Sequence, residues 1–260
     1  MPRIAMATPD PDKADLKELL RFLGLHKTAE NYPAQIEAAE KNNWSHLKFL
    51  EAIVSDEAGL KRERSIRARL DQARFPTIKT IDSFDFAFPK SIQRGKVLAA
   101  LSLQFLDRQE GFIFMGPPGT GKTHLAQAIG YAACLRGTRT LWTTAVDMVN
   151  YLQAAAADRS LHQALKTYTS PRLLICDEVG YLPFDQRGAD LFFQVISARY
   201  ERGSLIVTTN RPFKDWGKIF HDNTVASAIV DRLAHHSELI KIEGGSYRVK
   251  DRKSKMSTDE

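Results

Sequence analysis

The spacing of hydrophobic residues changes once along the chain, near residue 75. Before that point apolar side chains recur at intervals of three and four positions, which is typical of helices, and no alternating strand pattern occurs. Gly24 should end the first helix. Tyr32-Pro33 should interrupt the next segment, because the residue before a proline avoids helical backbone angles. We therefore expect a small all-helical domain, with helices over about 13–23, 34–41, 45–53 and 56–73.

Beyond residue 90, short apolar runs alternate with helical segments. The runs predict strands over 112–115, 138–143, 173–176, 205–209 and 239–242, and the helices span 92–107, 122–136, 145–156, 189–202 and 226–234. Strands that alternate with helices form a parallel sheet covered on both faces. The sequence thus predicts four regions: a helical domain at 1–75, a linker at 76–90, an α/β domain at 91–248 and a basic tail at 249–260.

The amino-acid composition excludes some classes of protein but does not identify the function. The 260 residues are 43% hydrophobic and 26% charged, which is ordinary for a globular chain. No apolar run reaches 18 residues and the N-terminus has no apolar signal segment, so we expect a cytoplasmic protein without a membrane span. The two cysteines lack the spacing of metal ligands. A formal net charge of +6 is compatible with an anionic partner.

A glycine-rich loop follows the first predicted strand and opens the next helix. It has the pattern G-x-x-x-x-G-K-[ST], in which glycines allow a tight turn and backbone N–H groups point at phosphate oxygens. Lys122 places a positive charge on the β- and γ-phosphates, and Thr123 offers its hydroxyl to Mg²⁺. The sequence therefore predicts an ATP and Mg²⁺ site formed by Gly116, Pro117, Pro118, Gly119, Thr120, Gly121, Lys122, Thr123 and His124.

Two acidic residues follow the third predicted strand. The apolar run 173–176 leads into Asp177 and Glu178, which places both carboxylates at the carboxyl edge of the sheet, where ligands of open α/β sheets bind. Asp177 would hold a Mg²⁺-bound water, and Glu178 would activate the water that attacks ATP. Together with the glycine-rich loop and its Lys122, this pair predicts hydrolysis of ATP to ADP and phosphate.

Two further residues have both a catalytic and an ordinary interpretation. Asn210 follows the β-branched run 205–209; it either touches the γ-phosphate or the attacking water, or it merely ends a strand before Arg211-Pro212. Arg232 lies in a predicted helix, where it either has a catalytic role or forms a local surface ion pair with Asp231. The residues alone leave both alternatives open.

Basic residues are concentrated in the last predicted helix of the N-terminal region. One face of that helix carries Ile66, Leu70 and Ala73 and should pack, while the rest presents positive charge. Such charges suit phosphate contacts, which give DNA affinity without sequence recognition, although an ordinary solvated helix face has the same composition. The candidate DNA-binding residues are Lys61, Arg62, Arg64, Arg67 and Arg69.

The order of these features resembles that of the AAA+ ATPases: Walker A at 116–123, Walker B at 173–178, an asparagine at 210 and an arginine at 232. Within that superfamily the chain resembles the IstB-like group, the ATPase helpers of insertion-sequence transposases, which is similar to helicase loaders of the DnaC type. The resemblance covers nearly the whole chain. Its further marks are residues 73–76 (ARFP), 78–86 (IKTIDSFDF), 177–181 (DEVGY) and 244–248 (GGSYR).

This resemblance implies a specific architecture. The fold would be α/β, a P-loop AAA+ core whose parallel strands have the order 5-1-4-3-2, joined to the small helical N-terminal domain. Arg232 would be an arginine finger that acts on the ATP of a neighbouring subunit, so the active unit would be a homo-oligomer, in a ring or a spiral. The helical lid and second sensing arginine of many AAA+ proteins have no counterpart in the 28 residues after Arg232 (260 minus 232).

The expected function is that of a DNA-binding ATPase that captures target DNA and stimulates a transposase. Its partners would be double-stranded DNA, the transposase and further copies of itself. A loader of the replicative helicase is the alternative, because it would share the ATPase core and direct its N-terminal domain at a protein. A nucleotide-gated interaction protein without turnover would not need Glu178, and a metabolic kinase would leave the helical domain unexplained.

Overall fold

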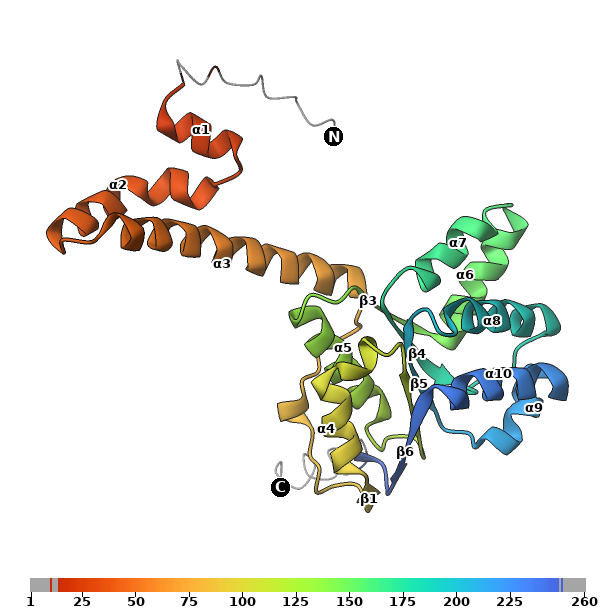
Figure 1. The fold of residues 1–260 in the computed structure, drawn as a ribbon. Coiled ribbons are helices and arrows are strands. Elements are labelled where there is room, and N and C mark those ends of the chain that lie inside the picture. The colour runs from red at the N-terminus through yellow and green to blue at the C-terminus, as the bar shows by residue number, and fades with distance from the viewer. Residues whose placement is uncertain (1–9, 11–13, 248, 250–260) are drawn as a thin grey trace, which may run out of the picture. The chain divides into compact units, whose positions relative to one another are not determined.

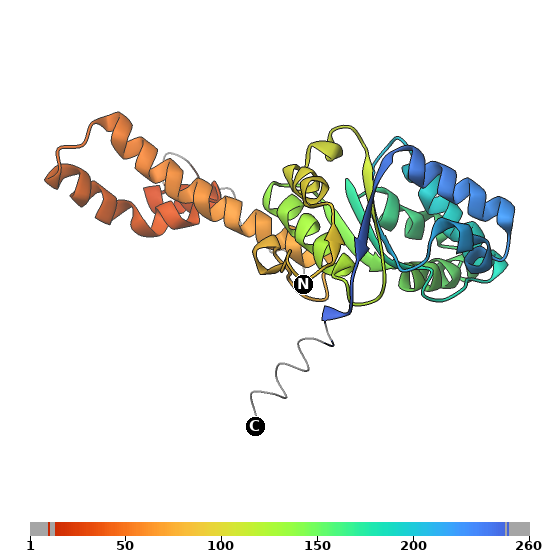
Figure 2. The ribbon, with the colours of Figure 1, turned by 90° about the horizontal axis from the view of Figure 1, so that it is seen from below.

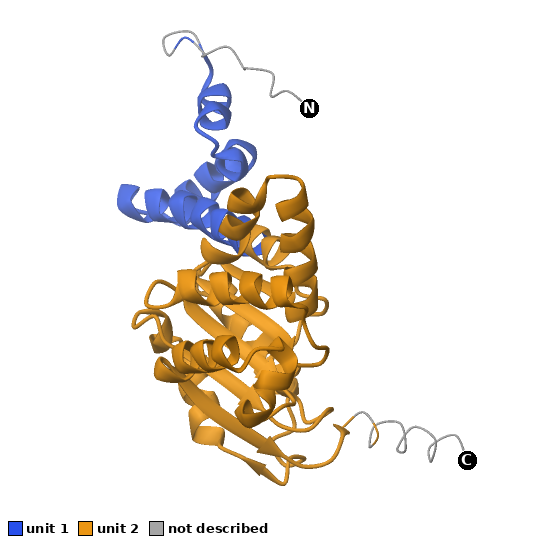
Figure 3. Cartoon of the chain, turned by 90° about the vertical axis from the view of Figure 1, so that its right-hand side faces the viewer, with its two compact units in different colours: residues 1–67 blue, residues 68–260 orange. Residues whose placement is uncertain are grey.

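The structure is a computed structural model, which describes residues 10, 14–247 and 249. Residue contacts divide the chain into two compact units, Met1–Arg67 and Ala68–Glu260, which Figure 3 distinguishes by colour. The division falls inside one long helix. The basic tail that the sequence predicts lies outside the described residues, apart from Val249.

The N-terminal unit is helical, as the sequence predicts. It contains α1 (Leu16–Phe22), α2 (His26–Lys41) and most of α3 (His46–Ala73). The Glu57 carboxylate of α3 caps the start of α2, because one of its oxygens accepts the backbone N–H groups of Lys27 and Thr28, each at 3.1 Å. Packing between two helices therefore satisfies backbone donors that the chain around His26 leaves without a local partner.

Two helix boundaries predicted for this unit are wrong. Helix α2 passes through Pro33 instead of beginning after it, and α3 is one helix where the sequence predicts two. Pro33 removes one helical hydrogen bond, but the Glu57 cap and the burial of Ala29 hold the preceding turns in place. Residues 53–56 contain neither glycine nor proline, so nothing interrupts α3 between the two predicted segments.

The second unit is built on a six-stranded sheet (Figure 1). Its strands are β1 (Ser91–Ile92), β2 (Gly111–Met115), β3 (Thr140–Thr144), β4 (Leu173–Val179), β5 (Ser204–Thr209) and β6 (Ser237–Glu243). They lie in the order β1-β6-β2-β5-β4-β3, in which β2 to β6 are parallel and β1 is antiparallel to β6. Counted along the chain from β2, the parallel strands have the order 5-1-4-3-2, which confirms the prediction; β1 was not predicted.

Helices cover both faces of this sheet (Figures 1 and 2). One face carries α4 (Arg94–Ser102) and α5 (Lys122–Leu135); the other carries α6 (Ala145–Ala157), α7 (Leu161–Thr169), α8 (Gln186–Arg199), α9 (Trp216–Phe220) and α10 (Asn223–His235). Alternate residues of a strand enter opposite cores: Phe114 packs on the α5 side and Ile113 on the α8 side. The central strands are thus buried on both faces, as expected for a parallel sheet.

Three features of the helical layers differ from the predictions. Helices α7 and α9 were not predicted, because one is short and largely polar and the other has five residues. The predicted helix over 92–107 ends at Ser102, where Leu103 adopts a left-handed φ of +62°, and a short 3-10 turn over Gln104–Leu106 follows. Among the described helices, none combines the length and the apolar character needed to cross a membrane.

A buried arginine joins the strands at the amino edge of the sheet. Arg199, at the end of α8, is 2% exposed, and its guanidinium donates to the carbonyls of Tyr168, Pro171, Arg172 and Ser204 at 2.7–3.2 Å. Burial lowers the pKa of Arg199 to about 10, so it stays charged at neutral pH. These bonds connect the segment before β4 to the start of β5, the two strands whose far ends carry acidic and polar site residues.

Candidate nucleotide site

The glycine-rich loop joins β2 to α5 at the carboxyl edge of the sheet, where the sequence places it. The loop follows Met115 and ends where α5 begins at Lys122. Gly119 and Gly121 have φ angles of +78° and +94°, a region that residues with side chains rarely adopt. A Cβ atom on Gly121 would also lie 2.5 Å from the Phe84 ring. The loop conformation therefore requires glycine at both positions.

Two side chains of the loop are fixed by one backbone carbonyl. The Lys122 ammonium donates to the Pro117 oxygen at 2.8 Å, and the Thr120 hydroxyl donates to the same oxygen at 2.9 Å. Lys122 is 9% exposed, so its charge is held within the curve of the loop. The N-terminus of α5 lies at the same place, and its free N–H groups and dipole attract phosphate oxygens. The loop and the N-terminus of α5 together have the features of an anion-binding site.

Asp177 lies at the centre of a hydrogen-bonded group beside the loop. Its Oδ1 accepts the Thr123 hydroxyl at 3.0 Å and also the Thr208 hydroxyl from β5. Burial raises the pKa of Asp177, although the two hydroxyls and the charge of Lys122 oppose that shift. A cation placed here would offset the cost of a buried carboxylate.

Glu178 lies in a bulge of β4. The pairing of β4 with β5 shifts between Cys176 and Val179, and Glu178 has a φ of +59°, which is uncommon for a glutamate. Its backbone N–H donates to the Thr208 hydroxyl at 3.0 Å. Asp177 is buried and Glu178 is exposed. The site therefore contains one carboxylate inside the protein and a neighbouring one that solvent can reach.

Asn210 leaves the sheet at the same edge. It directly follows β5, whose last residue, Thr209, pairs with Met115 at the end of β2. The structure therefore brings the loop, the acidic pair and Asn210 to neighbouring strand ends, as the sequence predicts. Thr208 was missed, because a hydroxyl residue within an apolar strand is too common a pattern to mark a site.

The oxygen donors of this group fit Mg²⁺. This ion prefers hard oxygen ligands and is usually held by one or two carboxylates, with substrate phosphates completing its coordination. The Thr123 hydroxyl and the Asp177 carboxylate lie 3.0 Å apart and face one another. In the described part of the chain, no group of three or more His, Cys, Asp and Glu side chains could hold a metal ion. Phosphate oxygens would therefore have to supply further ligands.

A cavity of about 560 Å³ opens beside the glycine-rich loop. The predicted site residues 119–124 line this cavity, and the predicted site residues 116–118 do not. His124 is held by the segment that the sequence predicts to be a linker: its Nε2 lies 2.9 Å from the Thr80 oxygen, and its ring is edge-on to Phe84. Further lining residues that sequence reasoning missed are Pro76, Thr77, Lys79, Ser83, Phe84, Asp85, Phe88, Pro89, Gln127 and Tyr247.

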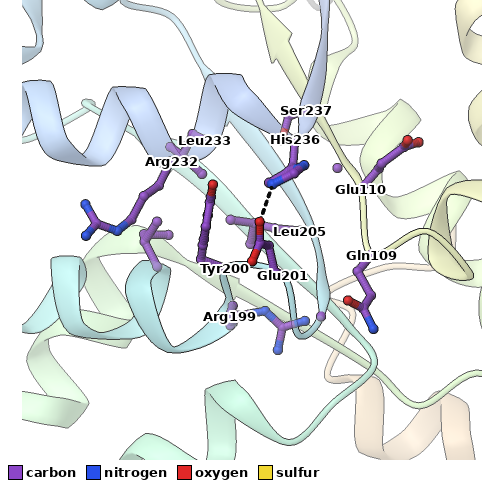
Figure 4. A pocket seen from close by; sticks show the side chains of 13 residues that line it. Gln109, Glu110, Arg199, Tyr200, Glu201, Leu205, Arg232, Leu233, His236 and Ser237 are labelled. Carbon is purple, nitrogen blue, oxygen red and sulfur yellow. Dashed lines mark hydrogen bonds and ion pairs between the residues drawn. The ribbon is translucent and has the colours of Figure 1, made fainter.

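Arg232 lies near the opposite, amino edge of the sheet. It lines a hollow of about 30 Å³ with Gly111 and Ser237, the first residues of β2 and β6 (Figure 4). The five residues of β2 separate this edge from the glycine-rich loop by about 13 Å. Arg232 therefore lies away from the cavity beside the glycine-rich loop.

Local contacts hold the Arg232 side chain along α10. Its Nη1 donates to the Ala228 carbonyl at 3.1 Å, and its guanidinium lies 4.7 Å from the centre of the Phe193 ring. Figure 4 shows the side chain extending away from the ion pair of His236 with Glu201. Among the described residues no ion pair joins Arg232 to Asp231.

The basic residues of α3 are not equivalent. Lys61, Arg62, Arg64 and Arg67 are exposed, whereas Arg69 is half-buried and donates through Nε to the Cys134 carbonyl at 3.0 Å. A helix turns by 100° per residue, so Arg62 and Arg69 share one side of α3, and Arg64 and Arg67 lie on another. The helix thus presents two rows of positive charge, and its contact with DNA stays a prediction.

Comparison with known proteins places the chain in a family. Residues 18–255 match the family described as IstB-like ATP binding protein. The chain is 40% identical over 241 residues to the insertion sequence IS5376 putative ATP-binding protein of Geobacillus stearothermophilus, covering 93% of this chain and 96% of that one. It is 38% identical over 239 residues to the insertion sequence IS21 putative ATP-binding protein of Pseudomonas aeruginosa, covering 92% and 90%.

Solved structures confirm the fold. The DnaC helicase loader aligns with a TM-score of 0.51 at 23% identity, covering 63% of this chain and 96% of that one. DnaA from Aquifex aeolicus, solved with AMPPCP bound, aligns with a TM-score of 0.54 at 24% identity, covering 71% and 56%. The predicted resemblance to IstB-like ATP-binding proteins is thus confirmed by the family match, and the predicted fold by the solved structures. The chain belongs to the family of IstB-like ATP binding proteins.

Proposed function

We propose that this protein is a DNA-dependent ATPase that assists a transposase, by capturing double-stranded target DNA and stimulating the transposase. The observation that carries the proposal is the joining of the Walker A loop to the Walker B carboxylate through the bond from Thr123 to Asp177. The names of the relatives, which are insertion-sequence ATP-binding proteins, support the link to transposition.

Each residue of the site has a role in hydrolysis that its position supports. Bound Mg²⁺ would neutralise phosphate charge, held through Thr123 and Asp177. Lys122 binds the β- and γ-phosphates from within the loop. Glu178, which is exposed on its bulge, accepts a proton from the attacking water and aligns it with the γ-phosphate. Asn210, on the adjacent strand end, orients the same water or the phosphate.

Hydrolysis requires a second subunit in this proposal. Arg232 is about 13 Å or more from its own glycine-rich loop, since the length of β2 separates the two edges of the sheet. A neighbouring subunit that presents this edge to the nucleotide cavity would bring Arg232 to the γ-phosphate. Binding of ATP then favours a homo-oligomer, and hydrolysis loosens it. The contacts of Arg232 with Ala228 and Phe193 are weak enough for the side chain to exchange them for phosphate.

DNA is bound through phosphates in this proposal. The exposed basic residues 61, 62, 64 and 67 of α3, with Arg69 on the side of Arg62, provide positive charge for contacts with DNA phosphates. Contacts of that kind are independent of DNA sequence and weaken steeply with salt. They suit a helper that captures many different target sites.

The decisive experiment measures DNA binding by the Glu178→Gln protein, which should bind ATP without hydrolysing it. Duplex and single-stranded DNA are compared in Mg-ATP and in Mg-ADP, and particle mass is followed in the same samples. We expect tight, ATP-dependent binding to duplex DNA together with growth into large assemblies. Lys122→Ala is the control, and it should neither bind ATP nor assemble.

Two other outcomes would point away from the proposal. A preference for single strands would favour a loader of the replicative helicase, whose N-terminal domain contacts a protein. Absence of DNA binding in both nucleotide states would favour a switch directed at proteins. Either result would overturn the transposition proposal and leave the assignment of the nucleotide site intact.

A further inference from the structure

The segment after β6 turns back across the glycine-rich loop. Strand β6 is parallel to β2, so the chain leaves the sheet at the edge where the loop lies. Gly244 permits the turn with a φ of +145°, and a Cβ atom there would lie 3.1 Å from the Lys90 backbone nitrogen. We refer to residues 244–247 as the C-terminal strap.

The strap is bonded to the loop through the backbone. The Tyr247 N–H donates to the Gly119 carbonyl at 2.9 Å. Ser246 lies so close that a Cβ atom on Gly119 would be 2.2 Å from its hydroxyl oxygen. Two features therefore require glycine at position 119: its positive φ angle and the close contact with Ser246 of the strap. The strap is therefore in direct contact with the glycine-rich loop at Gly119.

The Tyr247 side chain lines the nucleotide cavity beside Phe88. Its ring is edge-on to Phe88, with centroids 5.0 Å apart, and both residues line the cavity with Phe84. Tyr247 is 44% exposed, so part of its ring surface is available for contact. The same lining includes Lys122 and Thr123 of the glycine-rich loop. The cavity therefore combines groups suited to phosphate with aromatic side chains suited to a flat base.

We propose that Tyr247 is a nucleotide-binding residue that contacts the base of ATP and, through the strap, links occupation of the base position to the glycine-rich loop. The proposal rests on ATP binding at this site. A base offers a flat π-face, and aromatic side chains bind such faces whatever the base. The phosphates then contact the backbone amides of the loop. The strap connects Tyr247, at the base, to the loop, at the phosphates, through its bond to Gly119.

A purely structural role for Tyr247 makes a different prediction. If its ring only packs on Phe88, its loss would loosen the strap and weaken binding of the phosphates and the base alike. If the ring contacts the base, only ligands that carry a base depend on it. Inorganic tripolyphosphate with Mg²⁺ has the phosphates without the base, and it separates the two roles.

The test compares Kd values of Mg-ATP and Mg-tripolyphosphate, by titration calorimetry, for wild type, Tyr247→Ala and Tyr247→Phe. Tyr151→Ala, on α6 and 50% exposed, is the matched control because it does not line the cavity. We expect Tyr247→Ala to weaken ATP about tenfold and to leave tripolyphosphate within twofold of wild type. Tyr247→Phe and Tyr151→Ala should stay within twofold for both ligands. Thermal unfolding of each protein checks that it is folded.

Either of two results would overturn the inference. Unchanged ATP affinity in Tyr247→Ala would show that the ring does not contact the base. Equal weakening of ATP and tripolyphosphate would show that Tyr247 only supports the loop. Failure of the proposed function is distinguishable, since a wild-type protein that binds ATP but no DNA would contradict that proposal and leave Tyr247 where it is inferred.

Discussion

The two units of this chain bury very different amounts of side chain. The second unit, Ala68–Glu260, carries the nucleotide site and is called the ATPase unit below. Both faces of its sheet are packed, and Leu174, Phe192 and Trp216 have no exposed surface. In the described part of residues 1–67, only Thr28, Ala29 and Glu57 are buried. One side of α3 there carries Leu47, Leu50 and Val54, which are 66%, 57% and 56% exposed.

This difference shows that the two units are stabilised differently. Burial of apolar surface on both faces of a sheet stabilises the ATPase unit, and it fixes the strand ends that form the site. The N-terminal unit depends on helix formation and on a few polar contacts, such as the Glu57 cap. Its apolar and basic surfaces are typical of a unit that works by contact with other molecules.

The largest effect should come from one side chain of the packed unit. Arg232→Ala should bind ATP within about twofold of wild type but hydrolyse it about 10³-fold more slowly, because the γ-phosphate of the neighbouring subunit loses its positive partner. Turnover and ATP binding are measured together. Arg202→Ala, an exposed arginine in the turn before β5, is the matched control and should be unaffected.

Mixing two inactive proteins tests whether Arg232 acts across an interface. In a mixture of Arg232→Ala with Glu178→Gln, some interfaces combine an intact Glu178 with an intact Arg232. Part of the activity should therefore return. If no activity appears at any mixing ratio, the arginine does not act on a neighbouring subunit.

A matched pair of leucines tests the contrast in burial directly. Leu174→Ala should lower the free energy of unfolding by about 3 kcal/mol, because it leaves a cavity in a closed core. Leu50→Ala should cost less than about 0.5 kcal/mol, because the side chain is already mostly in water. Denaturant unfolding of both proteins measures the difference. Equal losses would mean that Leu50 is covered in solution, and the contrast between the units would not hold.

Charge on α3 should matter for DNA and not for ATP. Replacement of Arg62, Arg67 and Arg69 by alanine should reduce the slope of log affinity against log salt by up to about 2.7, which is about 0.9 for each DNA phosphate that the protein no longer neutralises. ATP affinity should not change. Arg21→Ala, on α1, is the control in the same unit. An unchanged salt slope in the triple variant would place the DNA elsewhere.

The smallest effect should be a gain in stability at the site itself. Burial raises the pKa of Asp177, so its ionised form costs folding free energy above that pKa, and the cost disappears as the pH falls through it. Asp177→Asn removes this cost at neutral pH and should raise the Tm without nucleotide by on the order of 2 °C. The gain should shrink in acid, and Mg²⁺-dependent hydrolysis should be lost. A lower Tm at neutral pH would contradict the expected sign.

Local spacing in the sequence placed the candidate nucleotide-site residues at the correct strand ends, because each motif is contiguous. The loop at 116–123 and the acidic pair 177–178 are contiguous, and each lies next to an apolar strand that the pattern also predicts. The strand order came from resemblance and not from spacing. Helix boundaries failed at Pro33, where the Glu57 cap holds the preceding turns, and between 53 and 56, where no glycine or proline interrupts the helix.

Three residues whose contacts sequence reasoning missed have partners far away in the chain. Thr208 bonds Asp177 31 positions away, Arg199 binds carbonyls up to 31 positions away, and Tyr247 reaches the loop from beyond the last strand. A threonine, an arginine and a tyrosine carry no signal of such contacts in their own neighbourhoods. Their roles depend on the sheet order, which brings together segments that are far apart in the chain.

The left-handed backbone of Glu178 has a consequence for which amino acids can occupy that position. Aspartate and asparagine tolerate a φ of +59° better than glutamate does, and glycine tolerates it best. Aspartate, however, would bring its carboxylate one carbon–carbon bond, about 1.5 Å, less far into the site. The glutamate is thus a compromise between an easier backbone and a longer reach. A library randomised at this one codon, scored first for folding and then for turnover, should enrich different residues in the two rounds.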